Sequence, residues 1–537
     1  MIRFLEAKAR FDQFIDQNMG MLNAPAITAA FTDKQGILAV SAHGYADAAA
    51  RVAVKPEMLF QIGSISKSFA AVVLLQLREE GVIDLQQPVS RYLRWFEIPS
   101  EYEPITIHHL LSHTGGISSG TERSPSALAE VWAMRRMATS TAPGSYFHYS
   151  NDGYKVLGLL LEAVLGEDIS TIYRERIFEP LGMKEAEPVI THDVRRRMAI
   201  GYQPYYDDRP LPQGGMLAPA TWFEGDSADG AICANVLDMA AYLRMLMNQG
   251  AGPRGPVISP ESFGLMTQPI IQPDDGYHGE FYGYGLNSGE REGHRHIWHG
   301  GGMVGYTSTM EADMEDGLGV IVLCSGPASP EVLGRYGLSL MRAALHQQEL
   351  PALPPPMDPF RVEDGALYAG SYRGANGSIQ IAAEGERLFF TANDDQQMPL
   401  EKREDGSFYT LHPDFDLFPL RFNQEKQELT HGPDWYLRDG VSAPDETGYP
   451  QEWEGYLGHY CSHNPWLNNF RVIVRQGKLL LVFPAGDESV LIPLAEGVFR
   501  VGKDDRSPER IRFEQLIDGK AVQANLSGGS YYRTFTR

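Results

Sequence analysis

Residues 63–77 restrict the structure of this chain more than any other segment. A short polar stretch leads into residues 69–77, which are apolar on nearly every side of a helix and therefore predict a buried helix. The charged residues that follow, and then Gly81, predict the solvated end of that helix. Ser64 and Lys67 are three residues apart, so they would share one face at its start.

A serine and a lysine at the start of a buried helix suggest a nucleophile with its base. In a desolvated pocket a lysine loses its proton more readily, and backbone N–H groups at a helix N-terminus can face an oxyanion. The pattern formed by Ser64 and Lys67 is weak evidence by itself, because any helix that starts with Ser and Lys produces it. Other motifs must support it.

Length and charge limit the classes of protein to consider. The chain has 537 residues, which predicts about three domains, and 43% hydrophobic with 21% charged residues is an ordinary globular composition. Its 46 basic and 69 acidic residues give a net charge of −23, which argues against nucleic acid or an anionic membrane as a partner. The charge would favour cationic ligands, although solubility explains it more simply.

Cysteine usage and hydropathy point to a cytoplasmic protein. Cys233, Cys324 and Cys461 are far apart and odd in number, so they predict neither a disulfide framework nor a CxxC metal site. The N-terminal residues carry charges where a signal peptide needs an apolar core. No stretch reaches the roughly 18 apolar residues of a membrane span.

Residues 1–350 predict an α+β domain in which an antiparallel sheet is flanked by helices and accompanied by an all-helical region. The expected elements are a helix over 3–17, a hairpin over 26–40, helices over 106–116, 153–165 and 238–247, strands over 306–310 and 319–324, and a last helix over 330–345.

The remaining third of the chain reads as two related small antiparallel β-barrels. A Pro-rich linker over 351–359 separates them from the first domain. Tyr368-Ala-Gly-Ser-Tyr372 recurs 88 residues later as Tyr456-Leu-Gly-His-Tyr460, and with three further repeats the offsets across four landmarks are 88 to 94. The predicted barrel domains span 360–446 and 447–537.

Two other segments could complete an acyl-transfer site, which needs a nucleophile, a base, oxyanion donors and a proton source. Tyr149 and Asn151 lie two residues apart just before a predicted helix, so in an extended segment both side chains face the same way. Residues 299–302, His-Gly-Gly-Gly, precede a predicted strand, where glycines let backbone approach a ligand. Both patterns also occur in ordinary loops.

Taken together, these segments resemble the serine β-lactamase and penicillin-binding-protein superfamily, in particular its class C-like branch with esterases and D-aminopeptidases. The matching stretches cover residues 20–345 and are specific as a set. They are Gly44–Asp47, Leu59–Phe69, Leu77–Leu85, Pro88–Leu93, Ile105–Thr106, Leu110–Gly116, Pro143–Gly144, Tyr149–Tyr154, Phe178–Met183 and His299–Tyr306.

The resemblance implies a role for each motif residue. Ser64, Lys67 and Tyr149 would be catalytic, and Asn151 would complete the Tyr-x-Asn motif. The third motif would be His299 to Gly301, and the oxyanion hole would be the backbone N–H groups of Ser64 and Gly302. Asn151, His299, Gly301 and Gly302 are the expected substrate-binding residues.

His299 departs from the pattern of penicillin-binding proteins and class C β-lactamases, which usually have lysine there to hold a substrate carboxylate. A neutral imidazole is a poorer anchor for a carboxylate, which argues against efficient β-lactam turnover. The esterase and D-aminopeptidase relatives share the histidine. A catalytic domain followed by two eight-stranded, lipocalin-like barrels also resembles the D-aminopeptidase architecture.

Two further patterns compete with this interpretation. Gly116 to Gly120 fits the Gly-x-Ser-x-Gly nucleophile elbow around Ser118, but the elbow needs a strand before it and a helical segment stands there instead. His294, His296 and His299 are close in sequence, yet no Cys or carboxylate nearby completes a zinc set. We therefore expect no metal and no cofactor.

The sequence thus predicts a serine hydrolase that forms an acyl-enzyme on a small ester, amide or short peptide, with D-aminopeptidase-like hydrolysis as the leading interpretation. A carboxylesterase and a weak β-lactamase are the alternatives among enzymes. A non-catalytic penicillin-recognising sensor is the alternative from another class. The expected partner is a small-molecule substrate, without nucleic acid or membrane, and a homodimer stays open.

Overall fold

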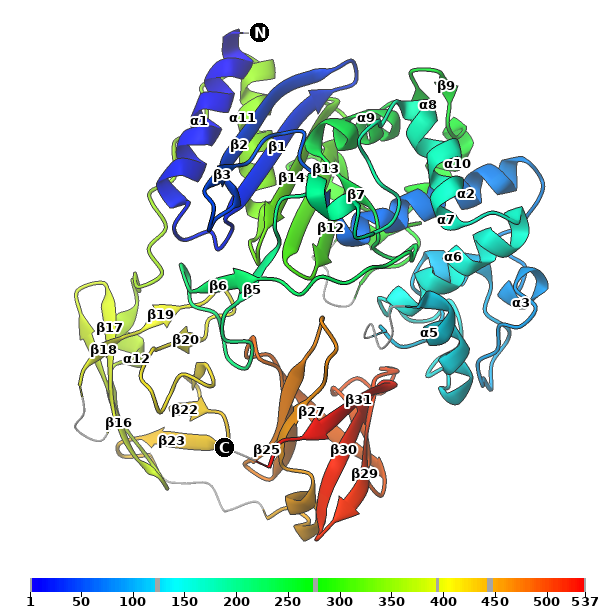
Figure 1. The fold of residues 1–537 in the computed structure, drawn as a ribbon. Coiled ribbons are helices and arrows are strands. Elements are labelled where there is room, and N and C mark those ends of the chain that lie inside the picture. Colours follow the sequence, from blue (N-terminus) through cyan, green and yellow to red (C-terminus); the bar gives the residue numbers. More distant parts are fainter. Residues whose placement is uncertain (1, 121–125, 274–278, 393–395, 442–447, 536–537) are drawn as a thin grey trace. The chain divides into compact units, whose positions relative to one another are not determined.

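The computed structural model describes residues 2–120, 126–273, 279–392, 396–441 and 448–535. The chain forms two compact units (Figure 1). Unit 1 comprises Met1–Gln203 and Leu217–Pro356, and unit 2 comprises Pro204–Met216 and Met357–Arg537. Among the helices that the structure describes, none is both long and apolar enough to cross a membrane.

Unit 1 is built on an eight-stranded sheet whose strand pairs are antiparallel, as predicted. Its strand order is β10-β11-β12-β13-β14-β1-β2-β3. The bounds are β10 Glu280–Tyr282, β11 Asn287–Arg291, β12 His294–Met303, β13 Tyr306–Asp313, β14 Leu318–Ser325, β1 Ala26–Asp33, β2 Ile37–Asp47 and β3 Val52–Ala53.

Both faces of the central strands β1 and β14 are buried, so a separate core lies on each side of the sheet. Helices α1 (Ile2–Asn18) and α11 (Pro330–Leu345) cover one face and pack on Ile27 and Phe31. The other face, which includes Ala26, packs on α9 (Val236–Met247) and α2 (Ser66–Glu79). Side chains alternate between the two cores because successive residues of a strand point to opposite faces.

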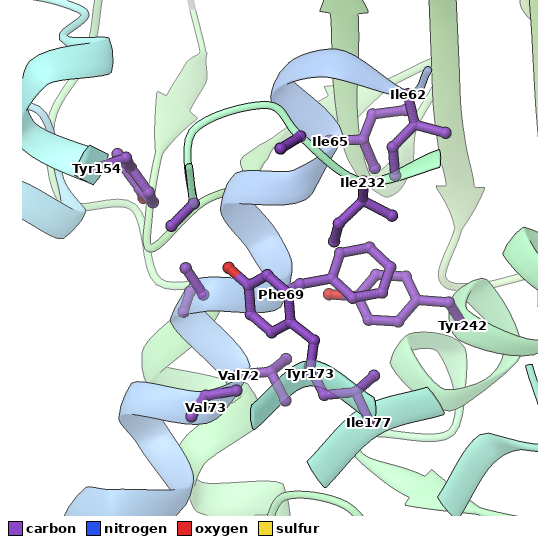
Figure 2. Packing of buried hydrophobic residues seen from close by; sticks show 14 of the residues in the cluster. Ile62, Ile65, Phe69, Val72, Val73, Tyr154, Tyr173, Ile177, Ile232 and Tyr242 are labelled. Atoms are coloured by element: carbon purple, nitrogen blue, oxygen red, sulfur yellow. The ribbon is translucent and has the colours of Figure 1, made fainter. Parts of the chain in front are cut away.

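Helix α2 is almost wholly buried, as its apolar sequence predicts. Phe69 stacks on Tyr242 with ring centroids 3.8 Å apart and meets Tyr173 edge-on (Figure 2). The 3₁₀ turn η1 (Gly63–Ile65) directly precedes α2. Ser64 therefore lies in that turn, just before the first residue of the α-helix.

The helical region packs around α2 and contains short helices. Helix α6 begins where the Ser150 hydroxyl accepts a hydrogen bond from the Gly153 N–H, and it ends at Gly166 with φ +73°. The segment predicted as a helix over 106–116 is helical only as α4, because His113 has φ +55°. The other bounds are α3 Val89–Tyr92, α4 Ile107–Leu111, α5 Ala127–Ala133, α6 Asn151–Leu165, α7 Ile169–Tyr173, α8 Glu179–Leu181 and α10 Pro260–Met266.

Unit 2 holds a closed barrel and a nearly closed one, which confirms the predicted pair of antiparallel barrels. The closed barrel has eight strands: β24 Gly458–Cys461, β25 Asn469–Arg475, β26 Lys478–Val482, β27 Glu488–Ala495, β28 Val498–Val501, β29 Arg510–Ile517, β30 Lys520–Leu526 and β31 Gly529–Arg533.

The nearly closed barrel is a nine-stranded sheet, in which Leu400 separates the two short strands β18 and β19. These two strands lie at opposite ends of the strand order. The bounds are β15 Gly370–Gly374, β16 Gly377–Glu384, β17 Arg387–Ala392, β18 Met398–Pro399, β19 Glu401–Lys402, β20 Phe408–Tyr409, β21 Leu420–Asn423, β22 Glu428–His431 and β23 Asp434–Arg438.

The sequence repeat corresponds to a repeated local structure. Tyr372 donates its hydroxyl to the Tyr368 carbonyl at 2.9 Å, and Tyr460 does the same to Tyr456 at 2.8 Å. The glycine between the two tyrosines has φ +155° in one barrel (Gly370) and φ +157° in the other (Gly458). The two barrels therefore share the geometry of their first strands as well as the sequence.

Residues 204–216 are a feature that the sequence analysis did not anticipate. They leave unit 1 between β5 (Tyr202–Pro204) and β6 (Leu217–Pro219) and belong to unit 2. Asp208 pairs with Arg471 of the closed barrel at 3.2 Å, and the Gln213 N–H donates to Glu401 of the other barrel at 3.0 Å. This loop therefore contacts both barrels.

The Pro-rich segment is also more ordered than a free linker. Arg10 donates to the Pro351 carbonyl at 2.9 Å, and Gln17 donates to the Pro354 carbonyl at 2.7 Å. Leu353 packs on the core beneath α1 and α11. Residues 351–356 thus belong to the packed structure of unit 1.

Candidate active site

The amine of Lys67 lies at the centre of a buried hydrogen-bonded group in unit 1. Its Nζ donates to the Ser64 hydroxyl at 2.9 Å, to Asn151 Oδ1 at 2.7 Å and to the Asp229 carbonyl at 2.8 Å. Lys67 is fully buried, whereas Ser64 is partly accessible. The spacing of Ser64 and Lys67 on one face accounts for the first contact, and tertiary packing supplies the other two.

These three contacts orient the lysine. An amide oxygen and a backbone carbonyl can only accept, so Asn151 and Asp229 take two N–H bonds of Nζ. The third tetrahedral direction points at the Ser64 oxygen. An ammonium presents a proton in that direction, and a neutral amine presents its lone pair to the serine hydroxyl.

Tyr149 adjoins this group from the segment before α6. The Lys67 Nζ lies 4.9 Å from the centre of the Tyr149 ring, and the tyrosine hydrogen-bonds Ser64. Burial raises the pKa of Tyr149 well above its usual value, and the bond to Ser64 partly opposes this shift. Tyr149 and Asn151 thus approach Lys67 from one short segment, held in place by the capping bond of Ser150.

The glycines of β12 bring backbone against the turn that carries Ser64. A Cβ built at Gly301 would lie 2.0 Å from the Ile62 carbonyl, and one built at Gly63 would lie 2.7 Å from the Gly302 nitrogen. The pairing of β12 with β11 ends at Trp298 among the described residues, so the next residues present their backbone edge without a strand partner there. Gly302 therefore lies beside the turn of Ser64.

His299 is buried on β12, with only 4% of its surface exposed. Its Nδ1 lies 2.6 Å from the Gly300 carbonyl, and its Nε2 lies 3.1 Å from the Tyr282 hydroxyl. Burial lowers the pKa of His299 to about 4, the Gly300 carbonyl opposes this, and the charge of Lys67 adds to it. The imidazole is therefore neutral at pH 7, as expected for this motif.

The comparisons with known proteins agree with this arrangement. Residues 11–344, which contain every residue named above, match the family described as Beta-lactamase. The chain belongs to the β-lactamase family. This assignment covers most of unit 1 and includes the three predicted motifs.

Relatives of known name are similar at low identity. Penicillin-binding protein 4 of Amycolatopsis lactamdurans is 26% identical, over 66% of this chain and 94% of that protein. The D-aminopeptidase of Brucella melitensis is also 26% identical, over 72% of each chain. The solved octameric penicillin-binding protein homologue from Pyrococcus abyssi superimposes with a TM-score of 0.59 at 26% identity, covering 80% of this chain and 99% of that one.

Two residues of this β-lactamase-family site were missed by the sequence analysis. The Asp229 carbonyl has no sequence signature. Tyr282 begins a Tyr-Gly-Tyr-Gly stretch, and Gly285 of that stretch, at φ +68°, would place a Cβ 2.8 Å from the Lys67 carbonyl. The dense glycines could have indicated that this segment approaches the catalytic helix closely.

The competing nucleophile motif has a different environment. The Ser118 hydroxyl lies 3.4 Å from Asp152 Oδ2 and 3.6 Å from the Met137 sulfur. An irregular segment after α4, not a strand, precedes it. Ser118 therefore lacks the strand-turn-helix context of a nucleophile elbow.

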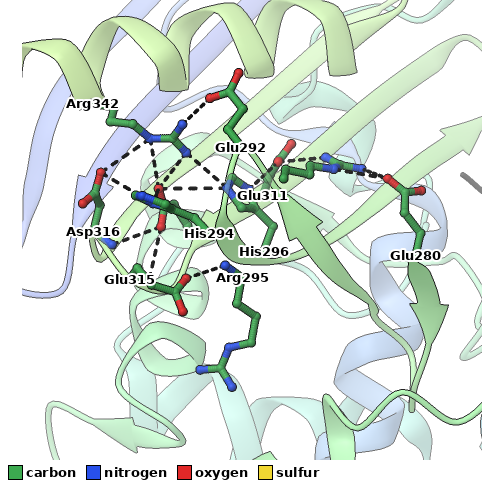
Figure 3. Close-up of polar contacts among 11 residues, drawn as sticks. Glu280, Glu292, His294, Arg295, His296, Glu311, Glu315, Asp316 and Arg342 are labelled. Carbon is green, nitrogen blue, oxygen red and sulfur yellow. Dashed lines mark hydrogen bonds and ion pairs between the residues drawn. The ribbon is translucent and has the colours of Figure 1, made fainter. Parts of the chain in front are cut away.

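The structure separates His299 from the other two histidines of the sequence cluster. His294 contacts Asp313 at 2.8 Å and His296 contacts Glu311 at 2.7 Å, within a polar network that Figure 3 shows. One nitrogen of His294 and carboxylate oxygens of Asp313 and Glu315 lie within 4.8 Å of one another. The Arg342 guanidinium contacts Asp313 at 2.7 Å, so an arginine already supplies positive charge there.

Proposed function

We propose that this chain is a serine hydrolase that forms an acyl-enzyme at Ser64. The observation that carries the proposal is the set of contacts around Lys67 Nζ. Asn151 Oδ1 and the Asp229 carbonyl accept hydrogen bonds from this amine, which also contacts the Ser64 oxygen. A lysine that only stabilised the fold would not need a serine in contact with its amine. Membership of the β-lactamase family, a family of hydrolases, supports the same role.

In the proposed reaction, neutral Lys67 takes the Ser64 proton while the serine oxygen attacks the substrate carbonyl. The resulting oxyanion accepts hydrogen bonds from the N–H groups of Ser64 and Gly302. Tyr149 passes the proton to the leaving amine or alcohol, whose bond to the carbonyl carbon then breaks. Tyr149 and Lys67 next activate a water, which releases the acid and restores Ser64.

The proposed substrates are small amides, short peptides or esters, with D-aminopeptidase-like hydrolysis first. The name of the Brucella relative and the neutral His299 support this order, because a neutral imidazole anchors a carboxylate poorly. A carboxylesterase and a weak β-lactamase are the alternatives. A penicillin-recognising sensor would bind without turnover.

A fluorophosphonate probe separates the enzyme from the sensor. We expect the intact chain to become labelled on Ser64 and to lose turnover in step with labelling. A panel of p-nitrophenyl esters, D- and L-amino acid p-nitroanilides and a chromogenic cephalosporin then ranks the substrate classes. A folded protein that neither labels nor turns over any member of the panel would contradict the proposal.

A further inference from the structure

Three buried side chains form one continuous hydrogen-bonded chain between two backbone groups, which we call the His–Tyr–His chain. It runs from the Ser150 N–H to His113 Nδ1 at 3.0 Å, and from His113 Nε2 to the Tyr282 hydroxyl at 3.2 Å. It continues from Tyr282 to His299 Nε2 at 3.1 Å and from His299 Nδ1 to the Gly300 carbonyl at 2.6 Å. Each of the three side chains is at most 4% exposed.

The two ends dictate where every proton lies. A backbone N–H can only donate, so His113 Nδ1 accepts and its Nε2 carries the proton that goes to the Tyr282 oxygen. At the other end a carbonyl can only accept, so His299 Nδ1 carries the proton and its Nε2 accepts from Tyr282. Because burial lowers the pKa of both histidines, the two imidazoles are neutral, and the end groups then place them in opposite tautomers with the tyrosine hydroxyl between them.

A proton added to His299 Nε2 would disrupt this arrangement of donors and acceptors. Protonated Nε2 of His299 would face the hydroxyl proton of Tyr282, which would have to turn away from His299. The other groups that face the chain are Tyr149, whose ring centre is 4.2 Å from that of His113, and Lys67, Tyr154 and His148. Burial lowers the pKa of both histidines, and Lys67 lowers it further whenever the lysine is protonated.

We propose that Tyr282 and His113 are positioning residues that fix the tautomer of the neutral His299 and keep both of its ring nitrogens occupied, so that the third motif offers a substrate neither a charge nor a free N–H. This inference rests on the proposed hydrolase function for its consequence in turnover. The site then discriminates against acyl groups that bear a carboxylate and accepts uncharged ones. Burial keeps His299 neutral, and the His–Tyr–His chain fixes which of its nitrogens carries the proton.

The first test does not depend on activity. In the intact protein labelled with ¹⁵N-histidine, we expect His299 to be the Nδ1–H tautomer and His113 the Nε2–H tautomer at about pH 7. Single His113→Gln and His299→Gln variants assign the two sets of resonances. Like tautomers at the two positions, or a doubly protonated His299, would overturn the inference whether or not the protein is a hydrolase.

The second test uses Tyr282→Phe, which removes the hydroxyl and keeps the ring. The matched control is Tyr284→Phe, because Tyr284 hydrogen-bonds His108 at 2.7 Å outside the His–Tyr–His chain. The substrates are p-nitrophenyl butyrate and mono-p-nitrophenyl glutarate, which differ by a terminal carboxylate. For the intact protein we expect kcat/KM to favour the butyrate, with little change of that preference between about pH 8 and about pH 6.

In Tyr282→Phe the preference should shrink roughly fivefold at both pH values, because the freed ring of His299 can take the Nε2–H tautomer and donate a hydrogen bond to the carboxylate. Tyr284→Phe should leave the preference and its pH profile as they are in the intact protein. A Tyr282→Phe protein that folds, turns over the butyrate and keeps the original preference at both pH values would overturn the inference without affecting the proposed function. If this variant does not fold, the tautomer measurement decides alone.

Discussion

At the scale of single residues, the site places neutral imidazoles next to the amine of Lys67. Burial lowers the pKa of His113 well below its usual value, and the charge of Lys67 is the next cause. The pKa of His299 is lowered to about 4. Both rings therefore stay neutral near Lys67 at pH 7, which limits the repulsion that a protonated lysine meets.

The first prediction concerns the nucleophile. Ser64→Ala should lower turnover roughly 10³-fold or more, while Ser118→Ala should change it less than about twofold. The reason is that Ser64 contacts Lys67 and Ser118 contacts Asp152. Peptide mapping of the phosphonate adduct checks the assignment. An adduct on Ser118 would contradict it.

The second prediction concerns the charge of the third motif. His299→Lys should tighten the binding of a cephalosporin, whose carboxylate gains a partner, by about 1 kcal/mol, typical of a partly exposed ion pair. A titration of the Ser64→Ala background measures binding without turnover, and His294→Lys on the same strand is the control. Equal or weaker binding by a folded His299→Lys protein would contradict the charge argument.

At the scale of elements, β12 can approach the 3₁₀ turn η1 closely because both carry glycines where they meet. The Ser308 hydroxyl donates to the Ile62 carbonyl at 2.9 Å, which ties β13 to the residue before η1. Gly301 lies against the same carbonyl. The position of Ser64 relative to Gly302 is therefore set by contacts of η1 with two consecutive strands, β12 and β13, that are distant from it in the sequence.

The third prediction follows from this packing. Gly301→Ala should lower kcat about 10²-fold or more, because its Cβ would lie 2.0 Å from the Ile62 carbonyl and would push the oxyanion donors apart. Gly264→Ala in α10 is the matched control, since no atom lies within 4 Å of a Cβ there, and it should leave kcat unchanged. Similar kcat values for the two variants would show that the close approach of β12 is not needed.

At the scale of the whole molecule, buried neutral histidines occur in both units. The pKa of His299 in unit 1 and that of His431 in unit 2 are each lowered to about 4, chiefly by burial. A histidine in the unfolded chain has a pKa near 6.5, so between about pH 6.5 and about pH 4 the unfolded state binds more protons than the folded one. Both units therefore lose stability as the pH falls through that window.

The fourth prediction is the size of this effect. The free energy of unfolding should decrease by up to about 3 kcal/mol for each such histidine between pH 7 and about pH 4. Calorimetry should show the transitions of both units moving to lower temperature over this range. His431→Phe should reduce the shift for unit 2 only. Transitions that do not move between these pH values would contradict the prediction.

The fifth prediction concerns the independence of unit 1. All the site residues and both cores on its sheet lie within residues 1–356, so a chain ending at Pro356 should fold and label at Ser64. Residues 204–216 should be replaced by a short Gly-Ser turn, because they pack within unit 2. Ending the chain at Leu350 instead should cost stability, since Pro351 and Pro354 accept hydrogen bonds from α1. A folded but unlabelled chain ending at Pro356 would show that unit 2 is needed for reactivity.

Local sequence spacing accounts for much of the fold. The burial of α2, the antiparallel sheet and the two barrels follow from apolar periodicity and from the repeat near Tyr368 and Tyr456, which depend on neighbours in the chain. The helix expected over 106–116 was too long, because the left-handed conformation of His113 ends regular structure. Family motifs carry the expected site residues, whose roles are still predictions.

The sequence by itself determined which residues could react, because Ser64 and Lys67 meet through a spacing of three residues within one turn. Only the tertiary structure decided how they are held. The Asp229 carbonyl accepts a hydrogen bond from Lys67, which is 162 residues away in the sequence. Tyr282 and His113 form a hydrogen bond although 169 residues separate them. The docking of residues 204–216 within unit 2 is of the same kind. Such contacts depend on how separate elements pack, and no periodicity along the chain records that packing.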